Sequence, residues 1–259
     1  MKENCLKFAI NIAYKAGEIM RSNFSNNVEK SYKEDDTIVT KADKEINDYL
    51  IEEVKKNFPG HCVDGEEKQF GQSDYVWVCD PIDGTAMFAR GVPVAVFSLA
   101  LVENGKPIIG VVYNPWQDNL YTAELGKGAY KNGKKINVSN TKIGDKKCLG
   151  HFDMWKNSEF NIYPIIDNLC KDSYIVSIGS VVRACMAVAE GEFEFVIFPG
   201  TKHKNCDIAA AKIIVEEAGG KVTDFFGDEQ RYDCDLKGAI VSNSLNHKVL
   251  IDAIKECLK

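Results

Sequence analysis

The sequence lacks the features that mark a membrane protein or a nucleic-acid-binding protein. Its longest mainly apolar run, from Val92 to Val102, is 11 residues, whereas a membrane-spanning helix needs about 20. Its 32 basic residues are fewer than its 38 acidic ones, and a net charge of −6 gives no general attraction to a phosphate backbone. We therefore expect no membrane partner and no nucleic-acid partner.

Paired cysteines and a secretory leader are also missing. The nine cysteines are an odd number without a CxxC pair, in a chain too long to need disulfides. Reduced thiols are the simpler interpretation. Glu3 and Asn4 interrupt any apolar stretch at the start of the chain, so we expect no signal peptide and a cytoplasmic protein.

The composition that remains is that of an ordinary folded protein, with 45% hydrophobic and 27% charged residues among 259. Apolar spacing predicts helices near residues 5–20 and 46–54, then a strand at 75–79 and a hairpin around Asn104-Gly105. Further strands are expected near 120–123 and 128–130. After Pro164 the pattern alternates strands and helices at 173–178, 181–189, 193–198, 207–218, 220–224, 238–242 and 245–257.

These patterns predict an α/β (α+β) fold with two layered sheets, because the middle is antiparallel while the end alternates. We expect an N-terminal α+β part over residues 1–140 and a C-terminal α/β part over 141–259.

The strongest chemical signal is the hexapeptide at residues 80–85, which reads Asp80-Pro81-Ile82-Asp83-Gly84-Thr85. An apolar strand runs into it, and proline does not continue a central strand, so we expect both aspartates at the strand's end. Two carboxylates and a hydroxyl so close together suit magnesium, which prefers oxygen ligands. An ordinary turn is the alternative for the Asp-Pro and Asp-Gly pairs alone.

The hexapeptide resembles the signature of the inositol monophosphatase family, in which a Trp-containing strand leads into Asp-Pro-Ile/Leu-Asp-Gly-Thr. Trp77 lies three residues before Asp80, as that pattern requires. Residues 39–43, 65–67 and 207–220 resemble three further motifs of the family, in the expected order. Four ordered motifs are more specific than any single one. The resemblance implies a layered α-β-α-β-α sandwich and, as is common among relatives, a homodimer.

The resemblance also implies a site for two or three Mg²⁺ ions. Glu66, Asp80 and the carbonyl of Ile82 would bind the first ion. Asp80, Asp83 and Asp207 would bind the second, and Glu66 would help to hold a third. Several buried carboxylates repel one another, and divalent cations reverse that balance.

The implied catalytic residues are Asp43, Glu66 and Thr85, with the Asp43–Thr85 pair orienting the attacking water. We predict five substrate-binding residues: Asp83, Gly84, Thr85, Ser180 and Lys204. The amides of Gly84 and Thr85 are suited to phosphate, especially if a helix begins there.

Three of these residues have a structural alternative. Asp43 precedes an amphipathic run and could cap the second helix, a role that is compatible with catalysis. Asp207 stands where a helix begins and could interact with its dipole. Lys204 could be an ordinary solvated lysine. Arg183, close to Ser180, would face the pocket or cover a helix surface.

The substrate end departs from the family pattern. Phe198 stands where many relatives have a hydroxyl-binding glutamate, and Cys206 replaces the tryptophan before Asp207. Residues 199–204 form a longer segment with two lysines and a histidine, which favours a second anionic group. A bisphosphate is therefore an alternative substrate.

The sequence thus predicts a phosphoric monoester hydrolase in which a magnesium-activated water attacks inositol monophosphate or a related sugar phosphate. The enzymatic alternatives are fructose-1,6-bisphosphatase, adenosine 3',5'-bisphosphate nucleotidase and histidinol phosphatase. A regulatory binding protein that retains the fold is the alternative outside enzymes. The resemblance further implies inhibition by lithium.

Overall fold

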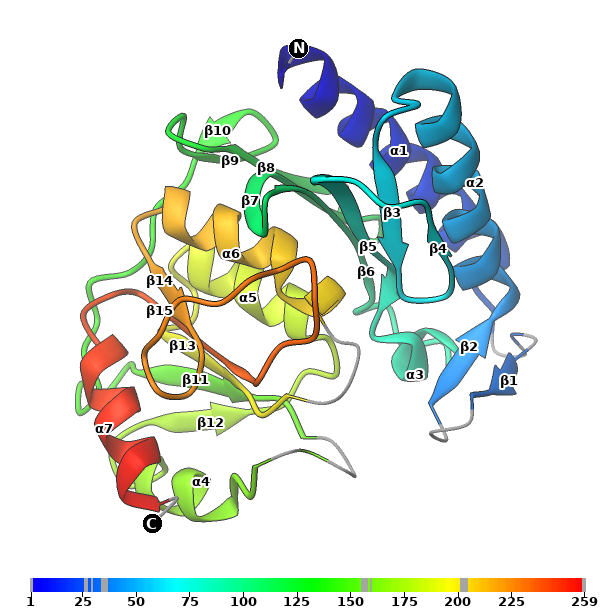
Figure 1. The fold of residues 1–259 in the computed structure, drawn as a ribbon. Coiled ribbons are helices and arrows are strands. Elements are labelled where there is room, and N and C mark those ends of the chain that lie inside the picture. Colours follow the sequence, from blue (N-terminus) through cyan, green and yellow to red (C-terminus); the bar gives the residue numbers. More distant parts are fainter. Residues whose placement is uncertain are drawn as a thin grey trace.

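The computed structural model describes residues 2–25, 28, 30–33, 37–154, 158, 160–200 and 205–257. Helices and two large sheets alternate in layers through these residues (Figure 1). Three apolar clusters fill the spaces between the layers. The predicted α-β-α-β-α architecture is confirmed.

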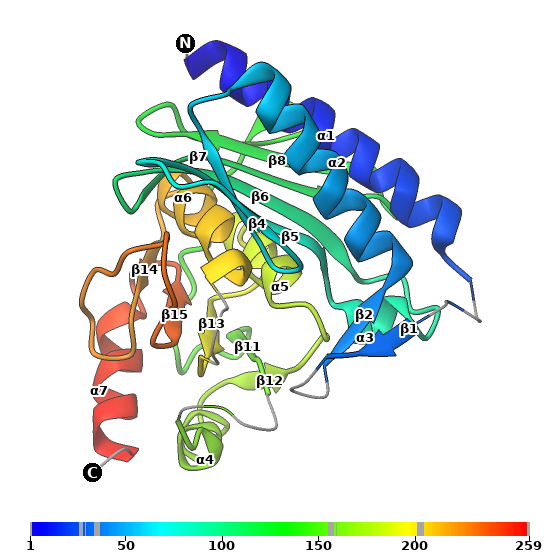
Figure 2. The same cartoon turned by 45° about the vertical axis from the view of Figure 1, so that its right-hand side comes forward.

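The first layer consists of α1 (Lys2–Asn23) and α2 (Lys41–Asn57), which lie together on the outer face of the larger sheet (Figure 2). Both expected helices are present, and both are longer than expected. Small buried residues on α1, including Ala9 and Ala13, allow it to approach the sheet closely. A short antiparallel ribbon of β1 (Lys30–Tyr32) and β2 (Ile38–Thr40) joins the two helices.

The second layer is an eight-stranded sheet with the order β10-β9-β8-β7-β6-β5-β3-β4. Every neighbouring pair is antiparallel except β3–β5, which is parallel. The strands are β3 (Cys62–Gly65), β4 (Gln69–Phe70), β5 (Tyr75–Asp83), β6 (Val96–Glu103), β7 (Lys106–Asn114), β8 (Asn119–Glu124), β9 (Ala129–Lys131) and β10 (Lys134–Lys135).

The expectation that β5 ends before the Asp-Pro pair is wrong, because the strand continues to Asp83. Its pairing with β3 stops at Cys79, and its register with β6 shifts between Asp80 and Asp83. Pro81 therefore lies in an irregular segment where its missing N–H removes no ladder bond. The two aspartates still lie at the carboxyl end of the strand.

The third layer contains two buried helices, α5 (Val181–Ala189) and α6 (Ala209–Glu217), between the sheets. The predicted bounds of α5 are confirmed. Asp207 does not begin α6 as expected, because it is the last residue of a 3₁₀ turn, Asn205–Asp207, that precedes the helix. A further short helix, α3 (Thr85–Phe88), follows β5 directly.

The fourth layer is a five-stranded sheet with the order β12-β11-β13-β15-β14, covered on its outer face by α4 (Tyr163–Leu169) and α7 (His247–Cys257). Its strands are β11 (Leu149–Phe152), β12 (Tyr174–Val176), β13 (Phe195–Phe198), β14 (Lys221–Thr223) and β15 (Ala239–Ser242). β11 runs parallel to β12 and β13, and the other pairs are antiparallel. The sequence predictions missed β11 and α4.

One apolar cluster joins the two sheets through α5 and α6. It contains Val78 of the larger sheet, Ala210 of α6 and Val196 of the smaller sheet. The division of the chain near residue 140 stays a prediction. Among the described residues, no helix combines the length and the apolar character that crossing a membrane requires.

Candidate active site

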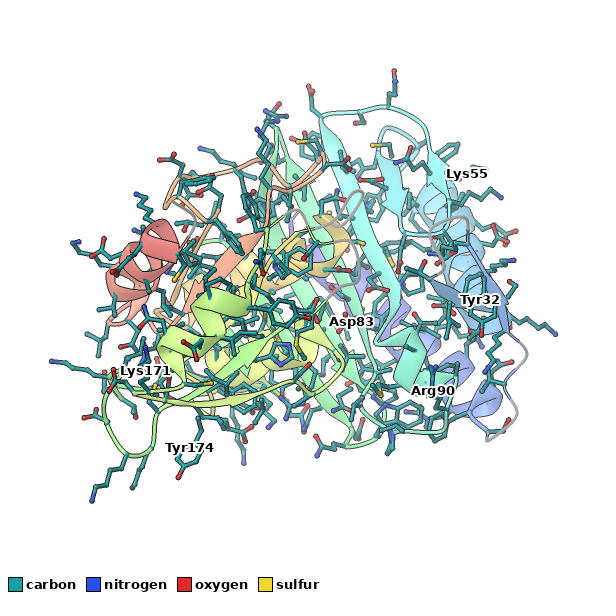
Figure 3. The ribbon with its side chains drawn as sticks, turned by 90° about the horizontal axis from the view of Figure 1, so that it is seen from below. Tyr32, Lys55, Asp83, Arg90, Lys171 and Tyr174 are labelled. Atoms are coloured by element: carbon teal, nitrogen blue, oxygen red, sulfur yellow. The ribbon has the colours of Figure 1, made fainter. Side chains whose placement is uncertain are left out.

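The end of β5 places two carboxylates in the interior of the molecule. Asp80 is 2% exposed and Asp83 is 6% exposed. The Asp80 Oδ1 accepts a hydrogen bond of 2.9 Å from the Ile82 N–H, so the irregular backbone and the side chain support each other. Figure 3 shows Asp83 between the strands of the larger sheet and the elements of the C-terminal half.

Asp207 reaches the same place from the other half of the chain. One oxygen each of Asp80, Asp83 and Asp207 lies within 4.8 Å of the others, and all three residues are buried. A second group brings Glu66, Asp80 and Cys206 within the same limit. Asp80 belongs to both groups, as expected of a ligand shared by two cations.

Asp83 is held by the start of α5. Its Oδ2 accepts hydrogen bonds from the Ser180 hydroxyl and from the Val182 N–H, the latter at 3.0 Å. Burial raises the pKa of Asp83 well above its ordinary value, and the neighbouring charge of Asp207 raises it further. The pair of hydrogen bonds favours the ionised form and acts against this shift.

Asp43 takes part in a capping box and also faces Thr85. The N-cap of α2 is Thr40, and Asp43 at the third helical position accepts bonds from the Thr40 N–H and hydroxyl through Oδ2. Thr40 is thus the N-cap residue, and the alternative of a capping role for Asp43 is realised as that of its reciprocal partner in the capping box. Its Oδ1 lies 3.4 Å from the Thr85 Oγ1, so capping and the predicted pairing coexist.

The Thr85 hydroxyl has a second acceptor. It lies 2.8 Å from the carbonyl oxygen of Ile82, nearer than to Asp43. Burial raises the pKa of Asp43 to about 7, opposed by the Thr40 hydrogen bonds and assisted by the charges of Glu66 and Glu67. Ile82, Thr85 and Asp43 thus form one connected group beside the carboxylates.

Glu66 lies where β3 ends, and Lys33 from the β1–β2 ribbon contacts it. The Lys33 Nζ is 3.1 Å from Glu66 Oε1 and 2.6 Å from Glu67 Oε1. Glu67 therefore supports Glu66 through the Lys33 ammonium group that both carboxylates contact. The sequence reasoning missed Lys33, because nothing in its polar segment signals a contact 33 residues away.

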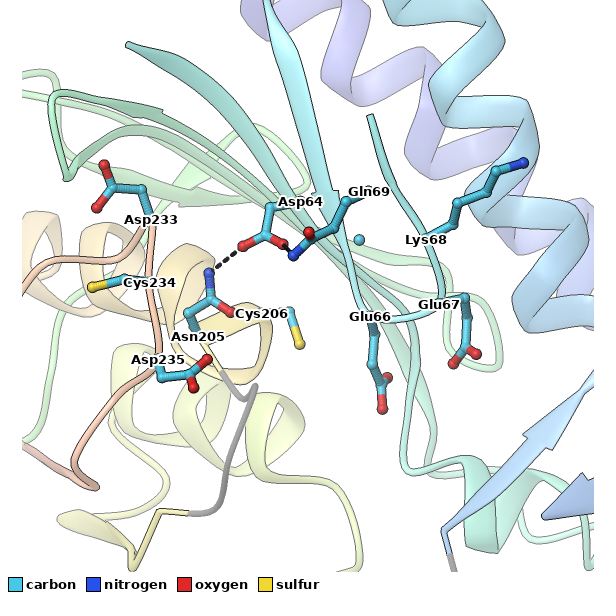
Figure 4. Close-up of a pocket in the computed structure, with 11 residues that line it drawn as sticks. Asp64, Glu66, Glu67, Lys68, Gln69, Asn205, Cys206, Asp233, Cys234 and Asp235 are labelled. Carbon is cyan, nitrogen blue, oxygen red and sulfur yellow. Dashed lines mark hydrogen bonds between the residues drawn. The ribbon is translucent and has the colours of Figure 1, made fainter. Parts of the chain in front are cut away.

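A cavity of about 350 Å³ opens beside Glu66 and Cys206 (Figure 4). Its other walls come from the β3–β4 hairpin, from Asn205 and from residues 233–235. Asp64 accepts hydrogen bonds from Gln69 at 2.6 Å and from Asn205 at 2.7 Å, which ties the hairpin to the turn that carries Asp207. Apart from the 65–67 motif, the sequence did not indicate these wall residues as functional, because they come together only on folding.

Gly84 adopts a positive φ of 90° at the N-cap of α3. A Cβ at this position would lie 2.8 Å from the Gly179 carbonyl oxygen, so both the backbone conformation and the space require glycine. A short helix does begin at Thr85. Arg183 pairs with Glu190 at 3.3 Å and covers a helix surface. Lys204 and the rest of the basic segment at 201–204 lie outside the described residues.

Comparison with known proteins decides the family. The model of the inositol monophosphatase family matches residues 1–259. The chain belongs to the inositol monophosphatase family. A fructose-1,6-bisphosphatase/inositol-1-monophosphatase of Thermotoga maritima is 34% identical over 256 residues, covering 98% of this chain and 97% of that relative.

Solved structures agree with this assignment to the inositol monophosphatase family. A Thermotoga maritima IMPase has a TM-score of 0.88 at 33% identity, with 98% of each chain covered. The extragenic suppressor protein SuhB of Bartonella henselae has a TM-score of 0.89 at 28% identity, with 98% of this chain and 99% of that one covered. As a member of this phosphatase family, the chain is a phosphoric monoester hydrolase.

The donor set fits the divalent cations on which inositol monophosphatases depend. Asp80, Asp83 and Asp207 offer only oxygen, which suits a hard cation such as Mg²⁺. Their burial makes mutual repulsion strong, as the raised pKa of Asp83 reflects, and a cation would relieve it. Cys206, which stands where the family pattern has a tryptophan, adds a sulfur beside Glu66 and Asp80.

Proposed function

We propose that the chain hydrolyses inositol monophosphate or a related sugar phosphate, with Mg²⁺ as the cofactor. The observation that carries the proposal is the buried trio of Asp80, Asp83 and Asp207, with the Asp43–Thr85 pair at its side. Metal-ligating oxygens and a water-orienting hydroxyl are the two parts that hydrolysis of a phosphate monoester needs.

The proposed metal ligands follow the two carboxylate groups. Asp80, Asp83 and Asp207 would hold one ion, and Glu66, Asp80 and the Ile82 carbonyl another, with Glu66 contributing to a third. When bound, such cations lower the pKa of water and neutralise charge on phosphate oxygens. Cys206 lies in the second group and is a further potential ligand.

Thr85 is the proposed proton relay. Its hydroxyl lies between the Ile82 carbonyl and Asp43 Oδ1, at 2.8 Å and 3.4 Å. If a bound cation engaged the Ile82 carbonyl, Asp43 would be the remaining acceptor for the Thr85 hydroxyl. The Thr85 oxygen then accepts a hydrogen bond from the attacking water and orients it toward phosphorus.

The substrate contacts of Gly84, Ser180 and Lys204 are also proposals. The Gly84 and Thr85 amides would bind phosphate oxygens as charge develops. The Ser180 hydroxyl already donates to Asp83, so we propose that it acts by holding that carboxylate in place. The name of the Thermotoga relative supports fructose 1,6-bisphosphate as the second candidate substrate.

A substrate panel tests the function. Phosphate release is measured from myo-inositol 1-phosphate, fructose 1,6-bisphosphate, adenosine 3',5'-bisphosphate and histidinol phosphate, with Mg²⁺ and with EDTA. We expect turnover only with Mg²⁺, and the highest kcat/KM on the inositol ester. Metal-independent turnover would reject the cofactor, and failure on all four substrates would favour a regulatory binding protein.

Lithium sensitivity, a homodimer and a cytoplasmic location stay predictions. Li⁺ is expected to inhibit by replacing Mg²⁺ at one position, which a Li⁺ titration at fixed Mg²⁺ measures. Light scattering coupled to gel filtration measures the mass in solution against the 28.9 kDa of one chain. A single-chain mass at micromolar concentration would reject the homodimer.

A further inference from the structure

The turn that carries Glu66 is held by two elements, β5 and α2. The Glu66 N–H donates to the Cys79 carbonyl oxygen of β5 at 3.0 Å, which fixes the start of the turn. A second contact comes from Asn47 of α2, a polar residue that is only 1% exposed. Figure 4 shows Glu66, Glu67 and Lys68 following one another in this turn. The place of the Glu66 carboxylate therefore depends on α2 as well as on the sheet.

The Asn47 side chain contacts the backbone on both sides of Glu66. Its Nδ2 donates to the Lys68 carbonyl oxygen at 3.1 Å, two residues after Glu66. Its Oδ1 lies against Gly65, one residue before Glu66, where a Cβ would come within 2.0 Å of that oxygen. Gly65 does not have a positive φ, so space rather than backbone conformation requires glycine here. The Asn47 amide and Gly65 thus form a matched pair that encloses the turn.

Stability alone does not explain an asparagine at this position. The Asn47 Oδ1 is buried and has no hydrogen-bond partner among the described residues. An unpaired buried acceptor costs free energy, and an apolar side chain of the same shape would avoid that cost. The contact that explains asparagine is therefore the bond from its Nδ2, which holds the end of the turn.

The helix α2 joins this turn to the proposed proton relay. Asn47 lies one helical turn after Asp43, so both side chains leave α2 on the same buried face. Asp43 reaches Thr85, at 3.4 Å, while Asn47 reaches the turn of Glu66. The charges of Glu66 and Glu67 are among the causes that raise the pKa of Asp43, so these groups lie within electrostatic reach of one another. One helix thus places both a relay residue and the support of a cation ligand.

We propose that Asn47 is a positioning residue that holds Glu66 beside Asp80 and Cys206 and thereby sets the cation affinity of that group. This inference rests on the proposed function, because it takes Glu66 as a ligand of the cofactor. Residues that orient metal ligands typically contribute about 10- to 100-fold to metal affinity. A displaced turn would move Glu66 and leave the carboxylate trio in place, so one cation position should weaken and the other should not.

Mn²⁺ binding to the substrate-free protein tests the role of Asn47. Electron paramagnetic resonance of free Mn²⁺ gives the number of bound ions and their affinities. Asn47→Ala is expected to weaken one class of site about tenfold and to leave the other unchanged. Asp48→Asn is the matched control, because Asp48 is the next residue of α2 and contacts only the exposed ammonium group of Lys68, at 3.0 Å. It is expected to keep the wild-type affinities.

A double-mutant cycle separates positioning from a general structural role. Glu66→Gln removes the charge of the ligand and should weaken the same class of Mn²⁺ site. If Asn47 acts through Glu66, Asn47→Ala causes no further loss of affinity in the Glu66→Gln protein. Equal losses in the wild-type and Glu66→Gln proteins would overturn the proposal, as would wild-type Mn²⁺ affinities in Asn47→Ala.

Asn47→Leu keeps the proposal testable if the alanine variant folds poorly. Leucine has about the shape of asparagine, so it fills the space beside Gly65 but cannot donate to the Lys68 carbonyl. We expect its urea unfolding midpoint to stay close to that of the wild type, while one class of Mn²⁺ site weakens about tenfold. Wild-type Mn²⁺ affinity in folded Asn47→Leu would contradict the positioning role.

Phosphatase assays distinguish this inference from the proposed function. Asn47→Ala should raise the Mg²⁺ concentration for half-maximal phosphate release about tenfold, with most of kcat recovered at saturating Mg²⁺. If the substrate panel shows no turnover at all, a selective loss of Mn²⁺ affinity would still support the role of Asn47. An unchanged Mg²⁺ requirement in an active Asn47→Ala enzyme would overturn that role, whatever the substrate.

Discussion

The two halves of the molecule contribute to the site in different ways. The N-terminal half supplies Asp80, Asp83 and Thr85 from one hexapeptide at the end of β5. The C-terminal half supplies single residues from separate elements: Ser180 at the start of α5 and Asp207 in a 3₁₀ turn. Two members of the buried carboxylate trio thus come from one local motif, while the third, Asp207, and the Ser180 hydroxyl that holds Asp83 come from distant segments.

The halves also differ in their buried ionisable groups. Asp43 in the N-terminal half has a pKa raised to about 7 by burial. His247 in the C-terminal half has a pKa lowered to about 4, mainly by burial and then by the charges of Lys221 and Lys212. Both groups favour the neutral form in the folded protein. The first therefore destabilises the fold as pH rises, and the second as pH falls.

The largest expected effect tests the first comparison. Asp80→Asn removes the carboxylate shared by both groups, whereas Asp207→Asn affects one. We expect kcat/KM to fall on the order of 1,000-fold for Asp80→Asn and about 100-fold for Asp207→Asn, by loss of charge stabilisation. Phosphate release at saturating Mg²⁺ measures both.

Asp74→Asn is the matched control, since it lies on the surface just before the opposite end of β5. It is expected to retain wild-type kcat/KM. Normal activity in Asp80→Asn would place the catalytic centre elsewhere. A greater loss of kcat/KM in Asp207→Asn than in Asp80→Asn would show that Asp207 contributes more to catalysis than the hexapeptide carboxylate does.

The second prediction concerns Asp43 in the metal-free protein. Its folded-state pKa of about 7 lies above the ordinary 3.8, so its stabilising contribution is complete below about pH 4 and is lost as pH rises through 7. Asp43→Asn keeps an acceptor for Thr40 and removes the titration. We expect the variant to be more stable than wild type at pH 8, by on the order of 3 kcal/mol.

Urea unfolding in EDTA between pH 4 and pH 8 measures this difference. The wild type should lose stability across that range more steeply than Asp43→Asn. Phosphatase activity of the variant should fall at the same time, because Thr85 loses its proposed proton acceptor. Identical pH profiles for the two proteins would show that Asp43 is ionised without penalty.

The parts of the fold and of the site that could be predicted from the sequence are mainly those set by neighbouring residues in the chain. The hexapeptide and the bounds of α5 follow from residue types and spacing within short windows, whereas the order of the layers was implied by the family resemblance. The continuation of β5 through Pro81 could not be predicted, because it depends on the pairing with β6, which resumes at Asp83 after a shift in register. The residue pattern of one strand does not show how far its pairing with a neighbouring strand extends.

Contacts between distant segments were also beyond the sequence. Lys33 meets Glu66 only because the β1–β2 ribbon folds toward the end of β3. Asn205 likewise meets Asp64 only because the turn that carries Asp207 folds against the β3–β4 hairpin.

The smallest expected effect sharpens the second comparison. His247 lies between Ser242, 2.8 Å from Nδ1, and Thr223, 2.9 Å from Nε2. Its folded-state pKa of about 4 lies below the ordinary 6.5, so its contribution is complete above pH 6.5 and is lost as pH falls through 4. His247→Gln keeps a donor and an acceptor but does not titrate.

Urea unfolding at pH 7 and at pH 4 measures the effect. Between these pH values the wild type should lose about 2 kcal/mol more of its free energy of unfolding than His247→Gln. The kcat/KM of the variant at pH 7 should equal that of the wild type. An equal loss in both proteins would assign the acid sensitivity to other groups and remove the contrast with Asp43.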